Sequence, residues 1–188
     1  MISLEHFSCV ADIFRYQSKT NGSCIAQVFE GRETTYEELD TFANKVANGL
    51  LNNNCGSGTR VGFLGKNSDH YFEILAGSSK ANVVIAGVNW RLAGPEIEYV
   101  LNNAEAEILF VGAEFYEIIE ELLPKLAAVR KVIAVDGKHK DWEDYSSWRD
   151  SQQNHDPKIS ISADDDVVQL YTSGTTGHPQ GVQLTTGN

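Results

Sequence analysis

A loop rich in glycine and small hydroxyl residues, at residues 171–182, has the clearest chemical potential in this sequence. It reads YTSGTTGHPQGV. Glycine removes side-chain bulk where backbone amides must approach an anion, and serine and threonine hydroxyls are neutral donors that can surround phosphate oxygens. The pattern therefore predicts a phosphate-binding loop, and the alternative is an exposed turn of small polar residues.

Two common phosphate-binding motifs do not fit this loop. A Walker A loop needs Gly-Lys-Ser/Thr five residues after its first glycine, and neither Gly174 nor Gly177 has that continuation. The segment nearest to a dinucleotide fingerprint, Gly56-Ser57-Gly58, has Val61 where the third glycine belongs. It also precedes an expected strand instead of following one, so we interpret it as a turn.

The rest of the chain alternates short apolar strands with amphipathic helices. Thr35 and Glu38 have the spacing of a capping box, and Pro95 suits the first turn of a helix. Helices are expected at 10–16, from 35, from 68, from 95 and at 115–123, and strands at 60–64, 83–88, 108–111, 132–135 and 167–171.

This alternation predicts an α/β fold with a doubly wound, mostly parallel sheet. A small antiparallel hairpin is expected near the N-terminus, where apolar segments flank Glu30-Gly31-Arg32. In doubly wound sheets, ligands bind beyond the carboxyl ends of the strands, and the last expected strand runs directly into loop 171–182.

Composition excludes several classes of function. The chain has 188 residues, a formal net charge of -11 and a pI near 4.8, which disfavours nucleic-acid binding. Cys9, Cys24 and Cys55 form no metal-ligand or disulfide pattern, which favours reduced thiols and a cytoplasmic location. No apolar window is long enough for a membrane span, and no secretory leader is evident.

Other polar and aromatic groups favour structural roles. Residues 164–166, three aspartates, lack a second ligand cluster, so we predict no metal site there. Trp142, Tyr145 and Trp148 follow three-residue steps and predict the packed face of a short helix. The histidines lack a recognisable catalytic pattern, so surface or structural roles are expected for His6, His70, His139, His155 and His178.

The segment YTSGTTGHPQGVQLTTGN resembles the signature loop of the adenylate-forming family, which includes acyl-CoA synthetases, luciferases and peptide-synthetase adenylation domains. Upstream, residues 35–39 (TYEEL) resemble the first core motif of this family and residues 80–92 (KANVVIAGVNWRL) its second. The run NWRL before Gly94-Pro95-Glu96 is more similar to carboxylic acid:CoA ligases than to peptide-synthetase domains.

This resemblance implies an enzyme that uses ATP and Mg²⁺ to convert a carboxylic acid into an acyl adenylate and then transfers the acyl group to CoA. Small molecules, namely the acid, ATP and CoA, would be its partners. Arg91 would contact CoA, although an exposed loop arginine is the alternative. The implied phosphate-binding residues are Thr172, Ser173, Gly174, Thr175, Thr176, Gly177 and Gln180.

The sequence departs from the family pattern at two positions, one in this loop and one after it. Gln180 stands where the family has a lysine. The glutamine keeps hydrogen-bonding capacity but lacks the positive charge of the lysine. Thr186 stands where acyl-CoA ligases usually place a histidine close to the acyl substrate. Together these changes indicate an altered substrate, reduced activity or a decayed copy, and for Gln180 a position that tolerates the change is the alternative.

The resemblance ends at Asn188, before the adenine pocket, the ribose-binding aspartate and the C-terminal lysine of the family. Residues 1–188 are therefore expected to be the incomplete N-terminal part of the large domain, inactive alone and prone to associate with itself or with the missing remainder. The rival hypothesis is a non-catalytic nucleotide-binding or assembly module, either a remnant or half of a split enzyme.

Overall fold

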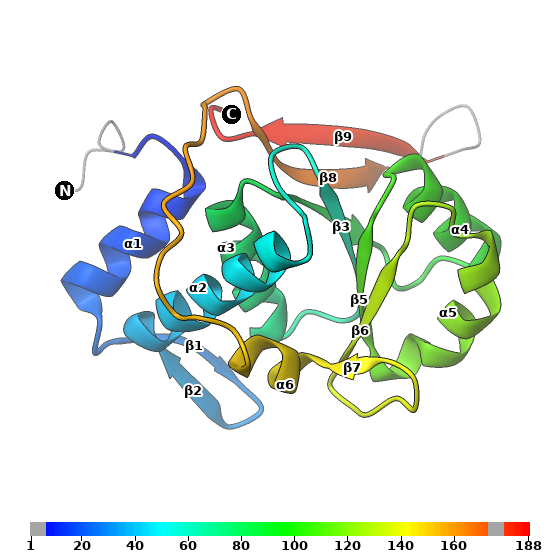
Figure 1. Cartoon of the computed structure of the whole chain (residues 1–188), viewed down its shortest axis with the longest axis horizontal. Helices are drawn as coiled ribbons and strands as arrows, with labels where there is room; N and C mark the ends of the chain where they lie inside the picture. The colour runs from blue at the N-terminus through cyan, green and yellow to red at the C-terminus, as the bar shows by residue number, and fades with distance from the viewer. Residues whose placement is uncertain (1–6, 173–178) are drawn as a thin grey trace.

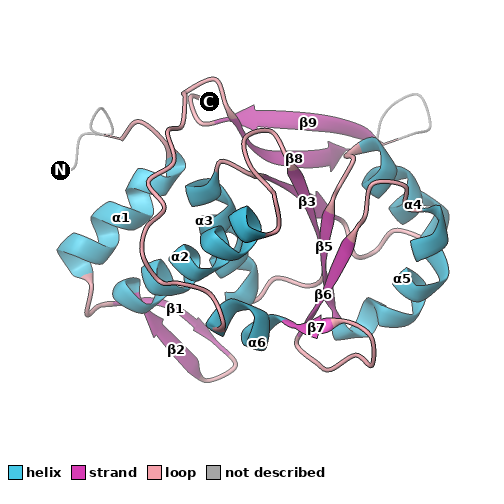
Figure 2. Ribbon diagram, viewed as in Figure 1, coloured by secondary structure: helices cyan, strands magenta, loops and turns pink. Residues whose placement is uncertain are grey.

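The centre of the molecule is a seven-stranded sheet, seen in a computed structural model that describes residues 7–172 and 179–188 (Figure 2). The strand order is β7-β6-β5-β3-β4-β8-β9. The strands are β3 (Arg60–Leu64), β4 (Val84–Val88), β5 (Ile108–Gly112), β6 (Lys131–Val135), β7 (Glu143–Asp144), β8 (Asp166–Thr172) and β9 (Gln180–Thr185).

All neighbouring strands of this sheet pair in parallel except the last pair, in which β9 runs antiparallel to β8. A separate two-stranded antiparallel sheet is formed by β1 (Ile25–Phe29) and β2 (Arg32–Thr35). Glu30 and Gly31 form its turn, both with positive φ. The predicted fold class, a mostly parallel α/β sheet with a small hairpin, is confirmed.

Helices cover both faces of the large sheet, as a doubly wound arrangement requires (Figure 1). One face carries α2 (Tyr36–Asn52), α3 (Asp69–Ala81) and α6 (Tyr145–Asp150), while α1 (Val10–Asn21) packs against α2 and α3. The opposite face carries α4 (Gly94–Asn103) and α5 (Tyr116–Leu122). Within residues 7–172 and 179–188, no helix is long and apolar enough to cross a membrane.

Local sequence explains where the principal helices begin. Thr35 accepts a hydrogen bond from the Glu38 amide, and the Glu38 carboxylate accepts one from the Thr35 amide, so the capping box is formed. Ser68 caps α3 by accepting a bond from the Tyr71 amide at 3.4 Å. Pro95 lies in the first turn of α4, where the missing N–H costs no hydrogen bond.

Two glycines allow bulky side chains to pack between the layers. A Cβ at Gly77 would lie 2.4 Å from the Val46 Cβ, so α2 and α3 approach closely only because this side chain is absent. A Cβ at Gly49 would lie 2.5 Å from the Trp148 ring. These close contacts fix the layer of α2, α3 and α6 that the sheet requires on this face.

The prediction that Trp142, Tyr145 and Trp148 share one face of a short helix is wrong for Trp142. Tyr145 and Trp148 belong to α6 and are buried in the core, as expected. Trp142 lies before the helix and stacks on His139, with ring centroids 3.7 Å apart. Asp144 caps α6, so the helix begins at Tyr145. Trp142 therefore lies in the segment before the helix, although it fits the three-residue spacing.

Two further expectations need correction. The first helix extends to Asn21 and not to Tyr16. Both edge strands were missed: β7 has only two residues, and the first residues of β9 had been assigned to the loop at 171–182.

Candidate functional site

The residues that flank the predicted phosphate loop face each other at the carboxyl end of β8. Thr172 ends β8, Gln180 begins β9, and the two are register partners with exposed side chains. The structure therefore brings these two predicted site residues together. The other predicted phosphate-binding residues lie outside the described residues, namely Ser173, Gly174, Thr175, Thr176 and Gly177.

A chain of side-chain hydrogen bonds holds the end of β8 in place. The Arg60 Nε donates to Gln169 Oε1 at 2.9 Å, and Gln169 Nε2 donates to the Tyr171 hydroxyl at 2.8 Å. That hydroxyl donates in turn to Asn103 Oδ1 at 2.8 Å. Because Arg60 comes from β3 and Asn103 from α4, two other elements fix the strand that leads to Thr172.

Arg91 lies at the carboxyl edge of the neighbouring strand, β4. Its side chain is exposed, in keeping with the expected loop arginine, and its guanidinium carbon lies 4.4 Å from the Trp90 ring centroid. The Lys66 ammonium, from the loop after β3, lies 5.4 Å from the same ring. Arg91, in the loop after β4, and Thr172, at the end of β8, therefore follow the carboxyl ends of two adjacent parallel strands.

Thr186 lies at the other edge of the sheet. Its neighbour Thr185 pairs with Asp166 at the start of β8, and the Thr186 amide donates to the Asp165 carbonyl. The Thr186 hydroxyl is buried and has no hydrogen-bond partner among the described side chains and backbone. The structure thus does not bring Thr186 together with Thr172 and Gln180, and its role near the acyl group stays a prediction.

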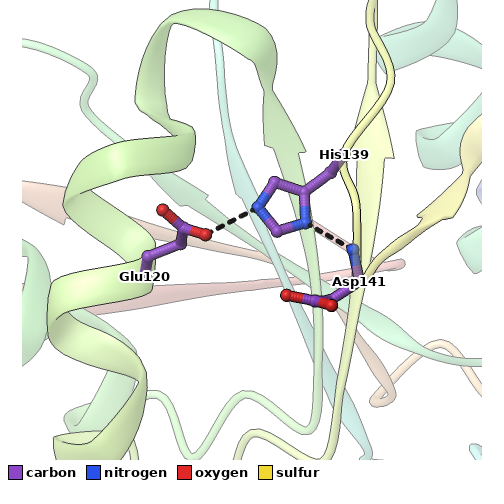
Figure 3. A group of neighbouring side chains, drawn as sticks. All are labelled: Glu120, His139 and Asp141. Carbon is purple, nitrogen blue, oxygen red and sulfur yellow. Dashed lines mark hydrogen bonds and ion pairs between the residues drawn. The ribbon is translucent and has the colours of Figure 1, made fainter.

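Glu120, His139 and Asp141 form the one group within the described residues whose ligand atoms are close enough to hold a metal ion (Figure 3). His139 Nε2 donates to Glu120 Oε1 at 3.0 Å, and the Asp141 amide donates to Nδ1 at 3.2 Å. A neutral imidazole that ligated a metal through Nε2 would carry its proton on Nδ1, against that amide. The Lys140 ammonium also lies 3.4 Å from Glu120.

These hydrogen bonds and ion pairs join α5 to the segment between β6 and β7. His139 is held by stacking on Trp142 and by an edge contact with Tyr116. A positively charged lysine already neutralises the carboxylates that a metal would need. A structural role for His139, as the sequence predicted, is therefore favoured over a metal centre.

A second polar pair, His70 and Asp136, was missed by sequence reasoning as a unit. The His70 Nδ1 donates to Asp136 Oδ1 at 2.8 Å, although the residues are 66 positions apart. Burial of the imidazole acts to lower the pKa of His70, but the hydrogen bond to Asp136 and the nearby carboxylates raise it overall. Asp136 directly follows β6, so its place at the carboxyl edge was the available signal.

Comparison with known proteins finds relatives that match most of this chain. A family model described as AMP-binding enzyme matches residues 14–188. The fatty acid–[acyl-carrier-protein] ligase ScoC of Streptomyces coeruleorubidus is 40% identical over 160 residues, which cover 85% of this chain and 29% of ScoC. A feruloyl-CoA synthase of Amycolatopsis is 32% identical, with 84% and 29% covered.

Solved structures of similar fold cover nearly the whole chain. The anthranilate CoA ligase AuaEII, in complex with anthranoyl-AMP, matches 98% of this chain with a TM-score of 0.90 and 25% identity. The N-terminal domain of FACL13 from Mycobacterium tuberculosis matches 95% with a TM-score of 0.87 and 26% identity. The matched part is 36% of the first protein and 44% of the second, so the chain spans less than half of each.

Proposed function

The chain belongs to the AMP-binding enzyme family, and on that premise we propose that it supplies the ATP phosphate-binding part of an AMP-forming carboxylic acid:CoA ligase. The observation that carries this proposal is the placement of Thr172 and Gln180 opposite each other at the carboxyl end of β8. The loop between them has the family's hydroxyl- and glycine-rich sequence. The edge of the sheet on which it lies is where α/β folds bind nucleotides.

In this reaction, a carboxylate oxygen of the acid attacks the α-phosphorus of ATP, the bond to the bridging oxygen breaks, and pyrophosphate leaves. The thiolate of the acceptor then attacks the acyl carbon and AMP leaves. Hydroxyls of the loop, including Thr172, would orient the β- and γ-phosphates for in-line attack. The chain thus contributes positioning and charge stabilisation, and no protein nucleophile is required.

The described residues include groups that would bind the phosphates of ATP and the acceptor. Thr172 presents a hydroxyl and Gln180 an amide, and both groups can donate hydrogen bonds to phosphate oxygens. Mg²⁺ would be held mainly by the phosphates and by water, as is usual for nucleotide sites. Arg91, exposed in the loop that follows β4, is proposed to contact the acceptor at the same edge.

A second acceptor is supported by one relative. ScoC is named a fatty acid–[acyl-carrier-protein] ligase and is 40% identical to this chain. A protein-bound thiol is therefore the alternative to CoA for the second half-reaction. The rival of a non-catalytic nucleotide-binding module is supported by Gln180, which lacks the charge of the family's lysine.

The proposal is tested by acid-dependent exchange of labelled pyrophosphate into ATP, using the polypeptide encoded by the complete reading frame that contains residues 1–188. We expect exchange with a carboxylic acid, and none from residues 1–188 alone. Absence of exchange by the complete polypeptide with a panel of aliphatic and aromatic acids, despite ATP binding, would favour the non-catalytic module. CoA and a phosphopantetheinylated carrier protein, added separately, then distinguish the two acceptors.

Loop variants test the phosphate assignment within the same assay. Replacing Thr175 and Thr176 together by valine keeps the branched shape and removes the hydroxyls. We expect the exchange rate to fall about a hundredfold, because a preorganised donor to the transition state is worth on the order of 3 kcal/mol. His178→Ala is the control, with little effect expected, and equal losses from both changes would contradict the assignment.

A further inference from the structure

A cavity of 610 Å³ lies at the carboxyl edge of the sheet, and Thr172 is not among its lining residues. It is lined by the segments that follow β3, β5 and β6 and by the turn between β1 and β2. In the sheet order, β4 separates β3 from β8, so this cavity and Thr172 lie at different strands of the same edge. Its volume falls in the usual range for small-molecule sites.

The order of the strands around this cavity is one that favours ligand binding in open α/β sheets. From β3 the chain passes through α3 to β4 on one side, and from β4 it returns through α4 to β5 on the other side. The direction of the connections therefore reverses between β3 and β5, and the helices that follow these strands, α3 and α5, lie on opposite faces of the sheet (Figure 1). This reversal of strand order is where open α/β sheets most often bind ligands.

Two exposed cations on the wall of the cavity are paired with acids yet retain donors. Arg32 donates through Nε and Nη2 to Asp69, both at 2.9 Å, which leaves Nη1 for another acceptor. The Lys66 ammonium donates to Glu114 at 2.9 Å and has two further N–H groups. Each acid is neutralised by its partner, while each cation keeps hydrogen-bonding capacity.

His70 adds a third donor on the same wall. Its Nδ1 is bound to Asp136, so the protonated ring presents Nε2–H as its remaining donor. The ring packs on Tyr145, with centroids 5.0 Å apart, which fixes its orientation. Arg32, Lys66 and His70 therefore each offer a donor to a ligand that accepts hydrogen bonds.

The remaining acids limit how much negative charge the ligand can carry. Asp144, also on the wall, is engaged as the cap of α6 and accepts from the Ser147 amide and hydroxyl. Glu30 adds another carboxylate at the mouth, so a multiply charged phosphate would be repelled. Phe29 and Phe115 supply apolar wall for a hydrocarbon group.

We propose that this cavity is a second ligand site, which binds a small organic monocarboxylate. Its carboxyl group accepts hydrogen bonds from Arg32, Lys66 and His70, and its hydrocarbon part lies against Phe29 and Phe115. The site is independent of the proposed ligase reaction, because none of these residues belongs to the phosphate loop or its flanking strands.

The experiment is a titration of ¹⁵N-labelled residues 1–188 with benzoate and, separately, with hexanoate, monitored by backbone amide shifts. We expect saturable shifts in the segments after β3, β5 and β6, and none of comparable size from benzamide, the neutral analogue, or from inorganic phosphate. Shifts confined to Thr172 and its surroundings, or no saturable shift with either acid, would overturn the proposal.

Lys66→Gln is the decisive variant, because Lys66 is half exposed and its removal does not threaten the fold. We expect benzoate to bind about tenfold more weakly, as the loss of a charge-assisted hydrogen bond predicts. Lys140→Gln, an exposed lysine outside the cavity, is the matched control and should bind like the parent. Equal affinity of the parent and Lys66→Gln would refute the site, and so would an equal loss in both variants.

Discussion

Gly181 lies directly opposite Tyr171 in the antiparallel pair of β8 and β9, and its bare Cα leaves room for the Tyr171 ring. A Cβ at position 181 would lie 2.7 Å from Gln169 Nε2 and 3.2 Å from the Tyr171 ring. Both side chains belong to the hydrogen-bonded chain that fixes the end of β8. Packing against Tyr171 and Gln169 therefore explains why glycine occupies position 181, independently of any ligand.

Gly181→Ala should lower the free energy of unfolding by about 1–3 kcal/mol, because the added methyl group forces Tyr171 or Gln169 out of place. Urea unfolding followed by circular dichroism measures this. Gly87→Ala, in the neighbouring strand, is the control: its Cβ would meet only Leu170, at 3.6 Å, and should cost little. Similar losses in both variants would count against the packing argument.

Lys80→Met should destabilise the fold by about 3 kcal/mol. The Lys80 side chain is fully buried, and its ammonium donates to Asp40 and to Asn44, both at 2.6 Å. Removing the cation leaves a partly buried carboxylate without its partner. Lys45→Met, which breaks a more exposed pair with Asp150, should cost at most about 1 kcal/mol. Equal losses from the two changes would contradict this account.

The His70–Asp136 pair should make stability depend on pH. Because the folded state raises the pKa of His70 above its ordinary value near 6.5, protonation stabilises the fold. This contribution is complete below about pH 6.5 and is lost as the pH rises through the folded pKa. Melting temperatures measured across this range should fall with pH, and the fall should be smaller in His70→Gln. Parallel curves would show that His70 is not the titrating group.

Gln180→Lys should raise the rate of acyl-adenylate formation in the complete polypeptide. Gln180 is exposed opposite Thr172, so a lysine there would extend toward the proposed phosphate site without repacking the sheet. A unit charge a few ångströms from a phosphate is worth roughly 1–4 kcal/mol of gross Coulomb energy. We expect the rate of acyl-adenylate formation to rise about tenfold. Gln183→Lys on the same strand is the control for added charge, and an equal gain there would remove the site-specific explanation.

The β8–β9 pair should mediate self-association of residues 1–188. Leu170 and Val182 are register partners, 43% and 44% exposed, and Leu184 on the same strand is 39% exposed. An uncovered apolar face on an edge strand favours pairing with another copy. Sedimentation velocity should show concentration-dependent oligomers, reduced when Val182 and Leu184 are both replaced by threonine. A monomer at every concentration would disprove this.

The sequence alone determined the fold class and the order of most elements. Residues 60–64, 83–88 and 108–111 are short apolar runs bounded by caps and turns, and such local patterns record burial on both faces of a sheet. The loop at residues 171–182 could be identified in the same way, because its glycines and hydroxyls are neighbours in the chain. Local signals need no knowledge of the partner segments.

The tertiary structure decided which distant residues meet. His70 and Asp136, or Arg60 and Gln169, approach each other only because parallel strands align their ends, and strand order is absent from local periodicity. The edge strand β9 was missed because its first residues, 180–182, belong to the segment that the sequence assigned to a loop, and its pairing with β8 is a tertiary contact. Trp142 was misplaced for a related reason: its stacking partner, His139, lies in an irregular segment whose path depends on packing against α5.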